Sequence, residues 1–271
     1  PPPPRVAHKH GALPAPVQLD WPWCASDISQ ERRARPYCTD FEPQQRTVRV
    51  IREVAPNAKI IAGGTAFSLY AELFMERLPE LDFGMWGEGE ERFPALLAKL
   101  DSPQEIAGLW YRDDAGEAVY TGPPPALDFA QLKAPRRDLV PFQPYVDSSA
   151  VSVGLQSKRG CALHCIHCSD TFLLGHAVRR KTAGQVVDEM EELVYDHHIP
   201  KLFFCDQIFN IPVKHSIDIC KEIVDRGLEV EWSAWFNEHR NTLPDELIIW
   251  LKKAGCGLGA AAGGAVGVVG G

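Results

Sequence analysis

The sequence predicts an α/β protein in which strands and helices alternate along two separate stretches of the chain. Three observations support this class. Residues 43–100 switch between helical and strand patterns, and residues 150–254 repeat a strand, a loop and a helix. In addition, a cysteine-rich loop, "CALHCIHC", directly follows the first strand of the second stretch. We expect parallel sheets, because strands joined by helices run in the same direction.

The first stretch begins after residues 1–42, a proline-rich segment that we expect to be poorly ordered or an artefact. "PQQRTVRVIREVAP" places Val48, Ile51 and Ala55 on one helical face, and "AKIIAGG" is typical of a short buried strand that ends in a glycine turn. "FSLYAELFMERL" predicts a helix. "LDFGMWGEGE" and "ERFPALLAKL" predict another strand, a turn and a helix. Residues 43–100 therefore indicate part of a doubly wound parallel sheet.

A connector occupies residues 101–147. It contains "GLWYRDDAGEAVYTG", which predicts a hairpin of two short strands around an Asp-Ala-Gly turn.

The second stretch, residues 148–257, contains three strand patterns, "AVSVGLQSKRG", "KLFFCDQIFN" and "EVEWSAWF", each followed by a loop and a helix. This order predicts a parallel sheet or an incomplete barrel. Thr182 and Gln185 form a capping box for the first helix, and Gly227 ends the second. The apolar stripe of the first helix is Val186, Val187, Met190, Leu193 and Val194. Residues 258–271 are a low-complexity tail, and we expect an artificial end or a lost reading frame near Gly257.

Composition and charge limit the kinds of molecule that this protein is expected to bind. The net charge of −8 argues against a nucleic-acid substrate, and no apolar run is long enough for a membrane helix. The amino-terminal segment lacks the apolar core of a signal peptide, so we expect a cytoplasmic protein with a small-molecule substrate. In a reducing cytosol, the eight cysteines are expected to be metal ligands or buried apolar residues rather than disulfides.

The cysteine loop carries the chemistry that is easiest to interpret. Cys161, Cys165 and Cys168 follow a predicted strand with the spacing C-x3-C-x2-C. Three thiolates from one loop can ligate three irons of a cubane cluster and leave the fourth iron open to a small molecule. With His164 and His167 the loop also offers a zinc set, although no second ligand pair follows downstream. A zinc-stabilised binding module is the non-enzymatic alternative.

"CALHCIHC", preceded by a strand and "KRG", resembles the cluster motif of the radical S-adenosylmethionine (radical SAM) superfamily. Residues 182–212 and 229–256 are similar to the first half of the partial (β/α)6 barrel of that superfamily. The resemblance implies a [4Fe-4S] cluster on the three cysteines that cleaves S-adenosylmethionine and releases a 5'-deoxyadenosyl radical. It also places His167 near the adenine and Asp206 near the methionine moiety. For Asp206, a turn or helix-capping carboxylate is the alternative.

The sequence pattern does not decide the role of several other polar residues in residues 148–257. Ser233, Trp235 and Asn237 share one face of the third strand, but the pattern does not decide which face points inward. Lys158 and Arg159 fit either a contact with a cofactor carboxylate or a solvated basic pair.

Residues 43–100 resemble the closing part of the cobalamin (B12)-binding domain that precedes the barrel in one branch of the superfamily. The matching residues are Gly63, Gly64 and the turn Gly87-Glu88-Gly89-Glu90. Glycines at strand ends allow close backbone approach to a bulky ligand, although each glycine pair alone also fits a simple turn.

This branch includes methyltransferases and the anaerobic tetrapyrrole cyclase. The resemblance implies a cobalamin-dependent methyltransferase, with a cyclase or oxidative enzyme without methyl transfer as the alternative. It also implies a small-molecule or natural-product substrate and an external electron donor such as flavodoxin or ferredoxin. The covered parts are the later portion of the cobalamin-binding domain and the first half of the barrel.

Overall fold

The computed structural model describes residues 42–139, 141–146, 152–165, 168–199, 201–238, 241–257 and 260–261. The chain divides into two units, residues 1–47 and residues 48–271, and the following account concerns the second unit together with helix α1, which begins in the first. The expectations for residues 1–41 and 262–271 lie outside the described residues.

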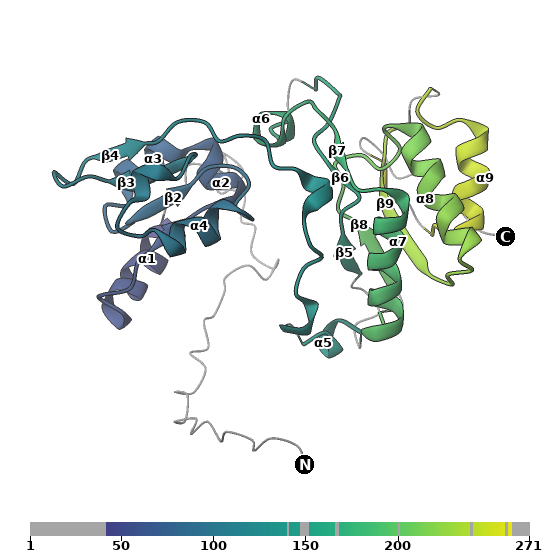
Figure 1. The fold of residues 1–271 in the computed structure, drawn as a ribbon, viewed down its shortest axis with the longest axis horizontal. Coiled ribbons are helices and arrows are strands. Elements are labelled where there is room, and N and C mark those ends of the chain that lie inside the picture. The colour runs from purple at the N-terminus through teal and green to yellow at the C-terminus, as the bar shows by residue number, and fades with distance from the viewer. Residues whose placement is uncertain are drawn as a thin grey trace, which may run out of the picture. The chain divides into compact units, whose positions relative to one another are not determined.

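The first stretch contains the expected alternation of helices and strands (Figure 1). The elements are α1 (Glu42–Val54), β1 (Ile61–Ala62), α2 (Gly64–Leu69), α3 (Ala71–Arg77), β2 (Phe83–Met85) and α4 (Arg92–Ala98). The single helix expected for "FSLYAELFMERL" is divided at Tyr70 into α2 and α3. The expected apolar face of α1 is only partly correct, because Val48 is buried whereas Ile51 is 37% exposed and Ala55 is exposed.

The sheet of this stretch is mixed rather than wholly parallel. β1 pairs with β2 in parallel, and β3 (Leu109–Arg112) pairs antiparallel with both β2 and β4 (Ala118–Tyr120). The predicted hairpin is present as β3 and β4. It belongs to the sheet, however, and is not merely part of a connector.

The rest of the connector packs against both stretches: its first helical turn lies against β3, and the part after β4 packs against the second stretch. It contains short helical turns and α5 (Gln143–Val146); the turns are η2 (Pro103–Glu105), η3 (Phe129–Gln131) and η4 (Arg137–Leu139). Phe129 is 2% exposed, and the buried Arg137 forms an ion pair with Glu189. The other carboxylate oxygen of Glu189 binds the Lys181 ammonium group at 2.5 Å. This buried triad attaches the connector to helix α7.

The second stretch forms a parallel sheet with the strand order β10-β9-β8-β5. The strands are β5 (Val153–Leu155), β8 (Lys201–Phe204), β9 (Glu231–Phe236) and β10 (Ala260–Ala261). The helices are α7 (Ala183–Glu191), which continues as the π-helical turn η5 (Glu192–Asp196), α8 (Val213–Asp225) and α9 (Asp245–Lys253). α8 packs between α7 and α9 (Figure 1). The capping box of Thr182 and Gln185 is confirmed, and Gly227 ends α8 with a φ of +63°.

The helices and the sheet share one apolar core. Val186, Val187, Met190 and Leu193 are fully buried on α7, as the stripe predicts. Along β9, alternate residues enter this core; they are Trp232, Ala234 and Phe236. Ser233 and Trp235 therefore lie on the opposite face of β9, away from the packed helices, and Asn237 follows the end of the strand.

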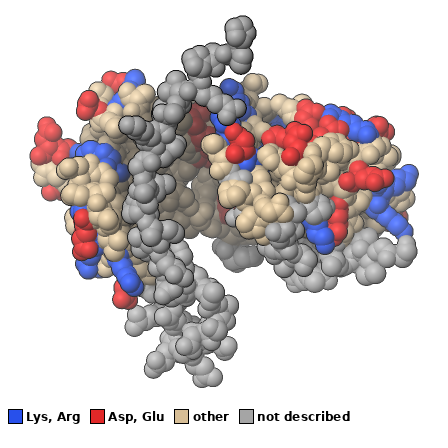
Figure 2. Space-filling view, turned by 90° about the horizontal axis from the view of Figure 1, so that it is seen from below, with Lys and Arg blue, Asp and Glu red and all other residues tan. Residues whose placement is uncertain are grey.

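Two short elements around the cysteine loop were not predicted, and the single strand expected for "AVSVGLQSKRG" is divided into two. β6 (Lys158–Arg159) pairs antiparallel with β7 (Arg179–Arg180), and α6 (Asp170–Leu174) lies between them in sequence. None of the helices in the described ranges is long and apolar enough to cross a membrane. On the face shown in Figure 2, basic and acidic side chains are interspersed.

Candidate functional site

The cysteine loop and α6 lie between β6 and β7, and the two ends of this segment are held together by backbone contacts. The amide of Cys161 donates to the carbonyl oxygen of Gly175 at 3.2 Å. Gly160 has a φ of +90°, and a Cβ atom at this position would lie 2.3 Å from the carbonyl oxygen of Ala177. Only glycine fits this close approach of the two segments.

The three cysteines are free thiols with different exposure. Cys161 is half-buried, whereas Cys165 and Cys168 are exposed. The amide of Cys168 donates to the carbonyl oxygen of Cys165 at 3.2 Å, which makes a tight turn between these two residues. Burial raises the pKa of the Cys161 thiol, and the charges of Cys165 and Cys168 raise it further.

The donor set fits an iron-sulfur cluster by its chemistry. Three cysteine thiols with no carboxylate among them are the ligands that iron in such clusters prefers. Within the part of the chain that the structure describes, no three His, Cys, Asp or Glu side chains are gathered closely enough to hold a metal ion. The loop therefore supplies three thiol donors, but their sulfur atoms are not gathered around one point in this structure.

Histidines flank these cysteines. The rings of His164 and His176 are stacked with a centroid distance of 4.2 Å, and both residues are exposed. His167, which the resemblance places near the adenine, lies outside the described residues.

Asp206 follows β8 and is 1% exposed. One carboxylate oxygen accepts the amides of Ser157 and Lys158 at 2.8 and 3.2 Å. The other accepts the Ser157 hydroxyl and the Lys158 ammonium group, the latter at 3.0 Å. Both oxygens are thus used by the segment that leads into the cysteine loop. These partners lie in another segment of the chain, so this geometry is neither a local turn nor a helix cap, and the contact with the methionine moiety stays a prediction.

Lys158 is 2% exposed and also donates to the carbonyl oxygen of Phe209 at 2.7 Å. Burial lowers the pKa of Lys158, although the Asp206 carboxylate opposes that shift. The expectation of a solvated basic pair is wrong for Lys158, because its ammonium group is buried and contacts Asp206 and Phe209.

The glycines expected to approach a bulky ligand lie around one hollow of about 630 Å³ at the carboxyl ends of β1 and β2. Gly64 and Gly87 have φ values of +80° and +74°, a conformation that glycine adopts without strain. Four glycines, apolar side chains and charged groups line the hollow. They are Gly63, Gly64, Gly87, Gly89, Ile61, Ala62, Met85, Phe93, Lys59, Glu88, Glu90 and Arg159. We call it the glycine pocket.

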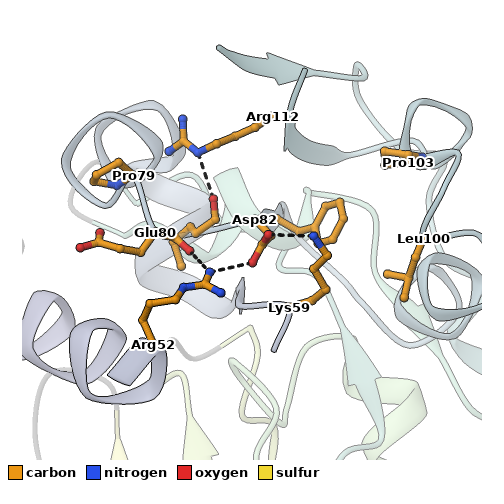
Figure 3. Close-up of a pocket in the computed structure, with 10 residues that line it drawn as sticks. Arg52, Lys59, Pro79, Glu80, Asp82, Leu100, Pro103 and Arg112 are labelled. Atoms are coloured by element: carbon orange, nitrogen blue, oxygen red, sulfur yellow. Dashed lines mark hydrogen bonds and ion pairs between the residues drawn. The ribbon is translucent and has the colours of Figure 1, made fainter. Parts of the chain in front are cut away.

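A second pocket, of about 430 Å³, is lined by Arg52, Lys59, Asp82 and Arg112 among other residues (Figure 3). Asp82 accepts the amide of Ile60 and binds both Arg52 and Lys59. Burial raises the pKa of Asp82, but these three partners more than offset that effect and hold it below the ordinary value. Arg112 donates to the carbonyl oxygens of Leu81 and Met75, so these charges serve mainly to hold neighbouring segments together.

Sequence reasoning missed several residues around the cysteine loop. Arg179 on β7 binds Glu88, and Phe172 on α6 meets Trp86 edge to face at a centroid distance of 6.2 Å. His215 on α8 is 6% exposed, and its Nε2 atom has no hydrogen-bond partner among the described residues. The basic segment "HAVRRK" was a signal for Arg179, but the segment alone does not identify its partner.

Comparison with curated proteins reveals relatives over much of the chain. An uncharacterised methyltransferase of Pyrococcus horikoshii is 27% identical over 212 residues, which are 77% of this chain and 46% of the relative. An anaerobic magnesium-protoporphyrin IX monomethyl ester cyclase of Cereibacter sphaeroides is 27% identical over 78% of this chain and 36% of its own length. TokK of Streptomyces tokunonensis, a cobalamin-dependent radical SAM methyltransferase, is 28% identical over 65% of this chain and 27% of its own length. The chain thus spans less than half of each relative.

Solved structures show the same fold. TsrM from Kitasatospora setae, a radical SAM methyltransferase solved with cobalamin and a [4Fe-4S] cluster bound, matches 84% of this chain and 45% of its own with a TM-score of 0.67 and 21% identity. OxsB, a cobalamin-dependent radical enzyme solved with aqua-cobalamin and S-adenosylmethionine, gives a TM-score of 0.66 at 19% identity, over 82% of this chain and 34% of its own. No protein-family model matches the chain. The resemblance and the α/β fold class inferred from the sequence are confirmed.

Proposed function

We propose that this chain, a relative of radical SAM methyltransferases and cyclases, forms the part of such an enzyme that holds the cluster and approaches cobalamin. The observation that carries the proposal is the loop with free Cys161, Cys165 and Cys168, which opens between paired strands next to the parallel sheet. In α/β proteins that position is where ligands commonly bind.

In this proposal the three thiolates hold a [4Fe-4S] cluster. When bound, the cluster supplies an electron to S-adenosylmethionine, and cobalamin supplies a methyl group. Half-burial of Cys161 shields one side of the site from water, whereas exposed Cys165 and Cys168 leave the loop accessible during assembly.

The buried Lys158–Asp206 ion pair supports the segment that leads into the cysteine loop. Because Asp206 holds the backbone of residues 157 and 158, it fixes the direction in which the chain enters the cysteine loop. We assign Asp206 a positioning role.

The glycine pocket is the part of the chain proposed to approach cobalamin. Gly63, Gly64 and Gly87 present backbone without side chains at the strand ends, and Met85 and Phe93 provide apolar contact. The exposed glycine backbone and the apolar side chains of this pocket fit one face of a large, flat ligand. TsrM and OxsB were each solved with cobalamin bound.

Methyl transfer to a small-molecule or natural-product substrate is the proposed reaction of the complete enzyme, with flavodoxin or ferredoxin as the electron donor. TsrM has been solved with tryptophan as substrate, an example of a small molecule. A ring cyclisation is the second candidate, favoured by the relatedness to magnesium-protoporphyrin IX monomethyl ester cyclases of several organisms.

The test is anaerobic reconstitution of the chain with iron and sulfide, followed by low-temperature electron paramagnetic resonance with and without S-adenosylmethionine. We expect a reduced-cluster signal that shifts when S-adenosylmethionine is added, because an iron without a protein ligand can bind it. Cys165→Ala should lose the cluster, since two thiolates are too few ligands to hold it.

Cys205→Ala is the matched control, because Cys205 is also an exposed free thiol but lies outside the loop. It should keep the iron and sulfide content of the unaltered chain. Full iron and sulfide content in Cys165→Ala would contradict the assignment, and tightly bound zinc without iron would favour the zinc-stabilised binding module.

A further inference from the structure

Glu88 lies in the turn Gly87-Glu88-Gly89-Glu90, which we call the glycine turn. Both of its carboxylate oxygens bind arginines next to the cysteine loop. Oε1 accepts from Nη1 of Arg159 at 3.0 Å, and Oε2 accepts from Nη1 of Arg179 at 2.6 Å. The three side chains are only 15–17% exposed, so solvent screens these pairs less than it screens surface ion pairs. Glu88 therefore connects the sheet of the first stretch to both strands beside the loop.

The two arginines occupy a position where they would repel each other. In the antiparallel pair of β6 and β7, Arg159 lies directly opposite Arg179. Like charges at directly opposed positions destabilise a strand pair. A carboxylate placed between the two guanidinium groups converts this repulsion into two attractions, and Glu88 provides that carboxylate with one oxygen for each arginine.

The same strand pair forms the base of the cysteine loop. Arg159 is two residues before Cys161, and Arg179 follows the loop and α6. Trp86, which directly precedes the glycine turn, also contacts Phe172 on α6, so this segment meets the surroundings of the loop at more than one point.

We propose that Glu88 is a positioning residue that holds the base of the cysteine loop closed and joins it to the glycine pocket. Arg159 belongs to both sites, because it lines the pocket and binds Glu88 and Glu90. The inference rests on the proposed function in that the loop is taken to hold the cluster. Glu88 is not proposed to contact a cofactor directly, since both of its carboxylate oxygens are bound by arginines.

The experiment compares Glu88→Gln with the unaltered chain after reconstitution with iron and sulfide. The measured quantity is the rate at which a chelator removes iron well below the unfolding temperature. Because glutamine removes the charge that opposes the Arg159–Arg179 repulsion, Glu88→Gln should release iron about five- to tenfold faster.

Glu90→Gln is the matched control. Glu90 lies in the same turn and binds Arg159, but it is 36% exposed, and among the described residues the carboxylate that binds Arg179 is Glu88. Its release rate should stay within about twofold of the unaltered chain, because ion pairs of exposed groups contribute little.

A rescue experiment separates positioning from a general loss of structure. Glu88→Gln combined with Arg179→Gln removes both the carboxylate and one of the repelling charges, so its iron release should return to within about twofold of the unaltered rate. The inference is overturned if Glu88→Gln releases iron at the unaltered rate, or if the double variant releases it as fast as Glu88→Gln alone.

A second measurement keeps the inference testable if the unaltered chain takes up no iron, a result that would refute the proposed function. Thermal unfolding of the iron-free single and double variants gives the coupling between Glu88 and Arg179. Non-additive effects support the ion-pair bridge, and additive effects overturn it.

Discussion

At the scale of single residues, His215 is buried beside charged groups without a hydrogen-bond partner for Nε2 among the described residues. Its pKa is lowered from 6.5 to about 4, mainly by burial and also by the nearby Lys158 and Arg180, whereas Asp206 and Asp218 oppose the shift. The folded chain therefore contains a neutral imidazole over a pH range in which the unfolded chain is protonated.

This difference predicts a loss of stability in acid. Below pH 6.5 the unfolded state binds a proton that folded His215 does not bind until about pH 4, so the free energy of unfolding should fall as the pH drops from 7 to 4. The contribution of this residue is at most about 3 kcal/mol. Denaturant unfolding at several pH values measures it, and His215→Gln should show a flatter profile. Identical profiles would contradict the prediction.

At the scale of elements, the first turn of α7 depends on its capping box. The Thr182 hydroxyl accepts the amide of Gln185 at 3.2 Å, and the Gln185 side chain accepts the amide of Thr182 at 2.8 Å. α7 supplies much of the apolar core and also carries Glu189, which binds the connector.

Thr182→Ala should lower the free energy of unfolding by about 1 kcal/mol, because an amide at the helix start loses its acceptor. Thr182→Ser keeps a hydroxyl at the same position and should lose much less. Urea unfolding of both variants measures the difference, and equal losses would show that the methyl group of threonine matters rather than the cap.

Elements with long periodic patterns could be predicted from the sequence, whereas short ones could not. The helices α7, α8 and α9 have repeated apolar positions and recognisable ends. β6 and β7 consist of two residues each, which is too short for any periodicity, and their pairing depends on residues about twenty positions apart. The division at Tyr70 and the attachment of β3 to β2 likewise depend on packing, which local sequence does not reveal.

At the scale of the whole molecule, the glycines of the glycine pocket and the cysteines of the loop lie on different stretches of the chain, so each set can be altered without changing the other. Gly64 has a φ of +80°, and a Cβ atom there would meet no atom within 4 Å. A larger side chain at this position is therefore strained and extends into the open space of the pocket, which Gly64 lines.

Gly64→Val should weaken cobalamin binding about tenfold and leave iron uptake unchanged, because the added side chain takes up space in the pocket alone. Titration with cobalamin, followed by its visible absorbance, measures the affinity. Gly116→Val is the control for backbone strain, since Gly116 has a φ of +84° and similar open space but lies in the hairpin. Equal cobalamin affinity in the two variants would contradict the proposed role of Gly64 in cobalamin binding.

The candidate site was predictable where its residues are neighbours in sequence. The cysteine motif and the glycines at strand ends are local signals, and Gly63, Gly64, Gly87 and Glu88 indeed line one pocket. The part played by Glu88 was not predictable, because its partners lie 71 and 91 residues further along the chain. Asp206 is similar, since its partners Ser157 and Lys158 precede it by 49 and 48 residues.

The close approach of Gly160 to Ala177 has a consequence for assembly of the cluster. A flexible loop loses conformational entropy when its ends are brought together. In this chain the ends of the cysteine loop are already joined by the folded backbone, so that entropy is lost during folding and not when metal binds. The loop then behaves as one multidentate chelator, and its affinity for iron should depend on how well the β6–β7 pair is formed.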